Sequence, residues 1–144
     1  MNHVVSSLLI SIALVTPSIV LAETPEEKGY AIAVEADNRN QGWQDSTADM
    51  IMILRNKRGD ESKRTLRVKS LEGQDDGDKS LTIFDEPKDV RGTALLTFTH
   101  KVDADDQWLY LPALKRVKRI ASRNKSGPFM GSEFAFEDMS AQEV

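Results

Sequence analysis

The chain has 144 residues, a net charge of −4 and a pI near 5.2, which allows one domain and argues against nucleic acid as the main partner. The absence of cysteine excludes disulfides, iron–sulfur clusters, thiolate zinc sites and cysteine nucleophiles. Apolar residues make up 40% and charged residues 29%, the balance of an ordinary soluble domain.

The first 22 residues are predicted to be a signal peptide. An apolar run from Val4 to Val15 is too short to span a bilayer as a stable helix, and Val20-x-Ala22 suits signal peptidase. We therefore predict cleavage between Ala22 and Glu23, export of the protein, and one domain over residues 23–144. Since Lys and Arg are absent from the leader, an uncleaved anchor is the alternative.

A helix is expected directly after the leader. Thr24 can act as the N-cap, Pro25 suits the first helical position, and Glu27 completes a T-x-x-E capping box. The helix should end at Asp37 or Asn38. Its short apolar face should pack on a sheet, or else act as a lid over a cavity. That face consists of Tyr30, Ile32, Ala33, Val34 and Ala36.

At least six strands in up-and-down order are expected after the helix. Alternating side chains place strands at 43–56, 62–71, 80–85, 90–100 and 107–111, with a last strand over 129–139. Every connection is short, so the fold class is mainly β, with an antiparallel sheet and one helix. Between Arg55 and Lys69 there are seven basic residues against two acidic ones. We interpret them as a solvated strand face that blunts edge pairing, with an anion-binding face as the alternative.

Little in the sequence points to catalysis. His100 is the only histidine outside the leader, and no G-x-S-x-G motif is present, so we interpret it as a strand-end histidine. The acidic loop from Glu72 to Lys79 lacks the ligand spacing of a calcium loop. We expect no catalytic residue, metal or cofactor.

Apolar side chains on alternating strand positions are the candidate ligand-binding residues. Together they could line one concave face of a curved sheet, or they could simply form the core. Methionine suits adaptable apolar contacts, and Trp and Tyr carry a polar tip. The ten candidates are Met50, Met52, Leu66, Val68, Leu81, Ile83, Leu96, Phe98, Trp108 and Tyr110.

Two motifs near the C-terminus carry a family resemblance. The segments W-L-Y-L-P-A-L-K-R-V-K-R-I, from Trp108, and G-P-F-M-G-S-E-F-A-F-E-D-M, from Gly127, resemble the outer-membrane lipoprotein-sorting family, the LolA-like proteins. The resemblance implies a half-open β-barrel with a helix as lid. It also implies a periplasmic carrier, not an enzyme, for the acyl chains of lipids or lipoproteins on their way to the outer membrane.

The same resemblance suggests partners. These are an inner-membrane exporter of the RND/MMPL type or a lipoprotein-releasing transporter, with transient membrane association. Four basic residues would meet anionic head groups or an acidic partner at the rim, or would only be solvated. They are Lys115, Arg116, Lys118 and Arg119.

Two other functions stay open, and the length of the chain raises a structural expectation. The protein could be an exporter-associated interaction module without cargo, or a lipid-directed hydrolase that uses His100. Family members continue further, so we expect an N-terminal fragment with an incomplete half-barrel and an exposed edge at 129–139, which should be poorly stable or self-associate.

Overall fold

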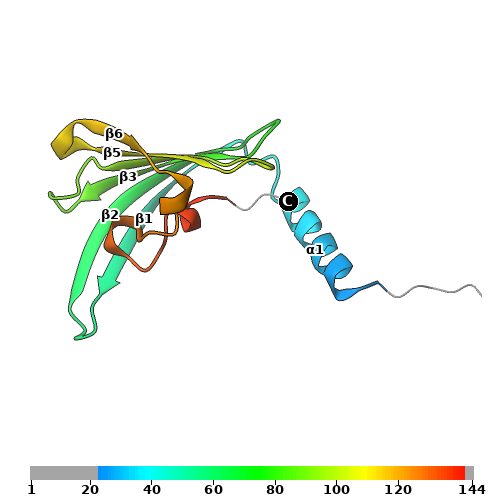
Figure 1. Ribbon diagram of the computed structural model, residues 1–144, viewed down its shortest axis with the longest axis horizontal. Helices are drawn as coiled ribbons and strands as arrows, with labels where there is room; N and C mark the ends of the chain where they lie inside the picture. The colour runs from blue at the N-terminus through cyan, green and yellow to red at the C-terminus, as the bar shows by residue number, and fades with distance from the viewer. Residues whose placement is uncertain (1–22, 142–144) are drawn as a thin grey trace, which may run out of the picture.

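The structure is a computed structural model that describes residues 23–141, so the predicted signal peptide lies outside the described residues. One helix is followed by six strands that pair in sequence order into a single antiparallel sheet. The sheet is open and curved, with β1 and β6 at its two edges (Figure 1). Within residues 23–141, no helix combines the length and the hydropathy needed to cross a bilayer.

The strands confirm the predicted antiparallel order. Short turns and loops join them, and 3-10 turns follow the last strand. They are β1 (Asp45–Arg55), β2 (Glu61–Leu71), β3 (Lys79–Glu86), β4 (Ala94–Phe98), β5 (Asp106–Leu111) and β6 (Arg116–Arg119).

Helix α1 (Pro25–Arg39) begins where the sequence predicts. The Glu27 N–H donates to Thr24 Oγ1 at 3.2 Å, and the Thr24 N–H donates to Glu27 Oε2 at 2.8 Å, which confirms the capping box. The helix has no buried residue and stands apart from the sheet (Figure 1), so the predicted packing of its apolar face on the sheet is wrong. Glu72 accepts hydrogen bonds from the N–H groups of Gly42 and Gln44 at 2.6 and 2.8 Å, which ties the linker to the loop after β2.

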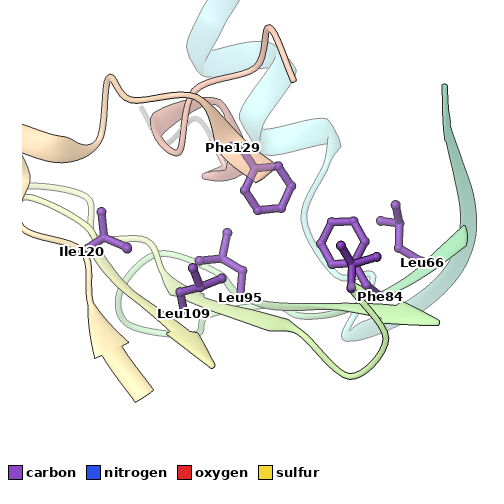
Figure 2. Packing of buried hydrophobic residues seen from close by; sticks show 7 residues of the cluster. Leu66, Phe84, Leu95, Leu109, Ile120 and Phe129 are labelled. Carbon is purple, nitrogen blue, oxygen red and sulfur yellow. The ribbon is translucent and has the colours of Figure 1, made fainter. Parts of the chain in front are cut away.

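The core lies on the concave face of the sheet. Side chains from β2 to β5 point toward Phe129, whose side chain is 0% exposed (Figure 2). Its ring contacts those of Phe84 and Phe136, with centroids 5.8 and 5.5 Å apart. The segment after β6 therefore packs against much of the concave face of the sheet. The buried apolar residues are Leu66, Phe84, Val90, Leu95, Leu109, Ile120 and Phe129.

The predicted last strand over 129–139 is wrong. This stretch forms two 3-10 turns, η3 (Phe129–Gly131) and η4 (Glu137–Met139), and a single isolated bridge joins Pro128 to Ala135. Met130 and Gly131 have φ values of 51° and 76°, which extended strands do not allow. We call residues 120–141 the covering segment, because they lie over the concave face. The exposed sheet edge on this side is β6 instead.

Side chains of the sheet hold the covering segment through its backbone. Gln107 Nε2 donates to Phe136 O at 2.6 Å, Arg64 donates to Met130 O, and Lys125 of the segment donates to Asp105 O. Backbone carbonyls that no strand pairs are thereby satisfied. The segment keeps a fixed place without joining the sheet.

Candidate functional site on the concave face

The strand register separates the ten apolar candidates. Met50 lies opposite Leu66, and both point to the concave face with Met52 and Val68. Leu81 lies opposite Leu96, and Leu96 opposite Trp108, on the convex face. The ten candidates therefore do not form one surface. The convex group is Leu81, Ile83, Leu96, Phe98, Trp108 and Tyr110.

A row of small polar side chains crosses the concave face. Directly paired residues in antiparallel strands share a face, so the register alone defines this row. Its neighbouring row is apolar except for Thr82, and runs through Ala48, Val68, Thr82, Leu95 and Leu109. The polar row runs through Ser46, Ser70, Ser80, Thr97 and Gln107.

A cleft of about 540 Å³ opens where the polar row meets the end of the covering segment. Val68 and Met139 form apolar walls of the cleft, and Ser70 and Ser80 supply hydroxyls. Trp43, from the linker between α1 and β1, also lines it. The volume is within the range of small-molecule sites, about 300–1,000 Å³. We call it the concave cleft.

Two buried oxygens, one on the polar row and one at the cleft, have no hydrogen-bond partner within residues 23–141. They are Gln107 Oε1, on a side chain that is 0% exposed, and Ser140 Oγ, on a residue that lines the cleft. Buried polar atoms are paired in most native structures because an unmet hydrogen bond costs about 1–3 kcal/mol. The polar end of the concave face therefore has spare hydrogen-bonding capacity.

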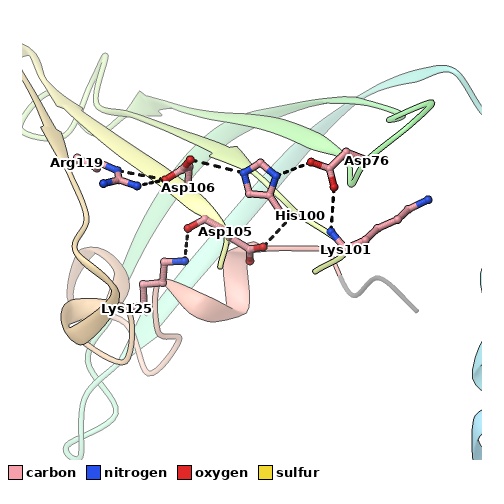
Figure 3. A network of polar contacts seen from close by, with 7 residues as sticks. All are labelled: Asp76, His100, Lys101, Asp105, Asp106, Arg119 and Lys125. Carbon is pink, nitrogen blue, oxygen red and sulfur yellow. Dashed lines mark hydrogen bonds and ion pairs between the residues drawn. The ribbon is translucent and has the colours of Figure 1, made fainter. Parts of the chain in front are cut away.

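His100 joins a network of charges at the same end of the sheet (Figure 3). Its Nδ1 lies 2.6 Å from Asp76 Oδ2, and its Nε2 lies 3.6 Å from Asp106 Oδ2. Asp106 also pairs with Arg119. These groups tie the loop after β2 to the turn between β4 and β5.

The network changes the acidity of its members. The hydrogen bond to Asp76 raises the pKa of His100, and that same bond is the main reason why the pKa of Asp76 falls to about 2. Arg119 lowers the pKa of Asp106. The imidazole is thus stabilised in its charged form, which is the wrong state for a general base.

The four basic candidates lie at or beside the β6 edge. Lys115 precedes the strand with φ 48°, and Arg116 and Lys118 lie opposite Leu111 and Leu109. Within residues 23–141, the first three candidates form no ion pair, whereas Arg119 is bound to Asp106. Three exposed cations are thus available at this edge.

The described residues offer no metal centre. Within 23–141, three or more His, Cys, Asp or Glu side chains never gather in a geometry that could hold an ion.

Sequence reasoning missed the polar row and Gln107. Its emphasis fell on apolar residues, and Ser or Thr at alternate strand positions ordinarily indicates a solvated face. Aligning the predicted hairpins could have found the row, because Ser70 and Ser80 are both the second residue from a strand end that faces the same loop. Burial of Gln107 depends on the covering segment, which no strand pattern predicts.

The open antiparallel sheet, its apolar concave face and the cleft define a class of protein with an exposed half-barrel. A domain from Vibrio parahaemolyticus described as an outer membrane lipoprotein-sorting protein domain is similar, with 65% identity and a TM-score of 0.79 over 81% of this chain. A DUF1329 family protein from Desulfovibrio piger is also similar, with 34% identity and a TM-score of 0.72 over 83% of this chain. This agreement in sequence and structure supports a protein of the LolA-like lipoprotein-sorting type.

The likeness covers part of each relative. The chain spans 49% of the Vibrio domain and 50% of the Desulfovibrio protein. A protein family described only as an uncharacterized protein matches residues 76–144. The search of curated proteins found no match.

Proposed function

We propose that the protein is a periplasmic carrier that binds acyl chains of a lipid or lipoprotein on its concave face, for transfer toward the outer membrane. The observation that supports this proposal best is the concave cleft of about 540 Å³, which opens beside an apolar row. Burial of apolar surface would supply the affinity, at roughly 25 cal/mol for each Å² removed from water. The similarity to a lipoprotein-sorting domain supports the same proposal, as does the generally non-enzymatic character of the family.

In this proposal the concave candidates, Met50, Met52, Leu66 and Val68, contribute to the acyl-chain surface. Leu66 is buried under the covering segment, whereas Met50 is exposed on the edge strand β1. The convex candidates would not contact the same ligand. Lys115, Arg116 and Lys118 would meet an acidic surface of a transporter or anionic head groups at the β6 edge.

A fluorescent fatty-acid probe tests the carrier proposal. Delipidated protein should bind the probe, and Val68→Glu should weaken binding by at least about tenfold, because a carboxylate would be placed beside the acyl chain. Val117→Glu is the matched control, since Val117 is an exposed valine on the convex face of β6. Failure of the wild-type protein to bind the probe would refute the carrier proposal.

A second candidate function is docking on an exporter without cargo. The three unpaired cations at the exposed β6 edge favour it, because edge strands accept a partner strand and cations attract an acidic partner. Purifying the protein with its transporter and finding no bound lipid would support docking over carriage.

A hydrolase is the third candidate, and His100 is its only ordinary base within residues 23–141. The carboxylates of Asp76 and Asp106 face both ring nitrogens, an arrangement that favours an ion-pair role. Ester hydrolysis that is present in the wild-type protein and lost in His100→Ala would favour this candidate.

A further inference from the structure

The polar row offers hydrogen-bonding groups with which a purely hydrocarbon ligand could form no hydrogen bond. Ser46, Ser70, Ser80, Thr97 and Gln107 stand at one level across five strands, next to the apolar row. Covering hydroxyls with hydrocarbon and giving them no partner is unfavourable. The concave face is therefore divided into an apolar part and a hydrogen-bonding part, which matches an amphiphile.

The charges around the cleft argue against an anionic head group there. Asp78 and Asp138 line the cleft. Lys79 also borders it, but its Nζ lies 5.1 Å from the centre of the Phe98 ring, which is on the convex face. A phosphate or a free carboxylate in the cleft would therefore approach carboxylates of like charge, and the Nζ of Lys79 is directed to the other face.

The unpartnered oxygens give independent support. Gln107 Oε1 is on the polar row, and Ser140 Oγ belongs to the cleft wall, and both are buried without a partner in residues 23–141. Gln107 Nε2 is already used by Phe136 O, so the amide is held with only its acceptor oxygen spare. Ser140 Oγ, which is on the cleft wall, can accept a hydrogen bond from a ligand hydroxyl.

We propose that the concave cleft binds the neutral head of an amphiphile that bears both hydroxyl and ester groups, with its chain along the apolar row. The inference rests on the carrier function proposed above and names the chemistry of the head. Ser70 and Ser80 donate to the ester carbonyl, and a ligand hydroxyl donates to Ser140 Oγ on the cleft wall. A monoacylglycerol has this combination of groups, whereas a fatty acid or a lysophosphatidic acid adds a negative charge.

Displacement of a neutral fluorescent probe, N-phenyl-1-naphthylamine, tests the proposal on the purified protein. Monopalmitoylglycerol, palmitate and palmitoyl lysophosphatidic acid share one chain and differ in the head. We expect monopalmitoylglycerol to displace the probe at a concentration at least about tenfold lower than either anion, because two added hydrogen bonds correspond to about that ratio.

Removing serine hydroxyls from the cleft tests where the head group of the ligand binds. The double variant Ser70→Ala, Ser80→Ala should bind monopalmitoylglycerol about tenfold more weakly than the wild-type protein does. Its affinity for palmitate should stay within about twofold of the wild-type value. Ser62→Ala is the control, since Ser62 lies on β2 with the same orientation but at the far, exposed end of the strand. A melting curve of each variant identifies any loss of folded protein.

The outcomes separate this inference from the carrier proposal. If all three amphiphiles displace the probe equally, or the anions bind more tightly, the neutral-head inference is wrong and the carrier proposal stands. If none displaces the probe, both are wrong. Equal weakening of monopalmitoylglycerol and palmitate in the double variant would mean that the serines shape the cleft without recognising the head.

Discussion

Leu95 and Leu96 are neighbours on β4, yet their environments differ. Leu95 is 1% exposed on the concave face, and Leu96 is half-buried on the convex face. Both faces carry large apolar side chains, so side-chain type does not decide which one is buried. The covering segment decides it, because Phe129 and its neighbours lie over one face only.

The convex face shows how an uncovered apolar surface can be kept in water. Phe98 and Trp108 pack edge to face with ring centroids 5.3 Å apart, and elsewhere on this face Arg67 forms a two-bond ion pair with Asp85. Aromatic pairing and charged neighbours cover part of the apolar surface. The concave face, by contrast, relies on a separate piece of chain.

Removing the Phe129 side chain should reduce the burial that distinguishes the concave face from the convex face. Phe129→Ala should lower the free energy of unfolding by about 3–5 kcal/mol, because a fully buried aromatic side chain is lost. Urea denaturation measures this change. Phe134→Ala is the control, since Phe134 is in the same segment and 55% exposed. Equal effects of both variants would show that the segment does not cover the sheet as described.

Alanine variants of the two neighbouring leucines on β4 compare how much each face contributes to stability. Leu95→Ala should cost about 2–5 kcal/mol, as other buried leucines do, and Leu96→Ala about 1 kcal/mol. The same urea titration gives both values. A larger loss at Leu96 would mean that the convex face is also covered in solution.

His100 lies where the convex face ends, and its titration tests the charge network. The raised pKa means that the contribution of His100 to stability is fully present below its usual value of 6.5 and is lost as the pH rises through the higher folded value. Asp76 acts in the opposite direction: its contribution is present above 3.8 and is lost as the pH falls toward about 2.

An NMR titration of the His100 ring should therefore give a pKa above 6.5. Asp76→Asn should move it back toward 6.5, because the main cause of the shift is removed. An unchanged value in this variant would assign the shift to Asp106 instead.

The smallest effect is expected at the hairpin of β1 and β2. Ile53 is 56% exposed on the convex side, so Ile53→Thr should change the free energy of unfolding by less than about 0.5 kcal/mol. Met52→Thr, one residue away on the concave side and packed against the core, should cost more. Thermal melts of the two variants compare them, and a reversed order would contradict the assigned faces.

The sequence predicted strands β1 to β5 because alternation is a local property, but it did not predict β6. Ala48, Met50 and Met52 alternate with Asp49 and Ile51, and strand β1 follows that pattern. The capping box of α1 is equally local, and its prediction is confirmed.

What the sequence did not predict depends on contacts between distant segments. The grouping of the ten apolar candidates needed the cross-strand register, which places Phe84 and Leu95 on the core side in place of Ile83 and Leu96. The covering segment has strand-like aromatic spacing, yet packing of Phe129 against Phe84 overrides it. The link between the segment after α1 and the loop after β2 runs through Glu72, thirty residues from Gly42.

Neighbour-to-neighbour pairing of the six strands has a kinetic consequence. Each strand closes only a short loop when it pairs, so the sheet can grow in chain order at low entropic cost. The covering segment is different, since the bond from Arg64 to Met130 joins residues 66 positions apart. It should dock last, after the rate-limiting step. Substitutions in this segment should then accelerate unfolding and leave the refolding rate nearly unchanged.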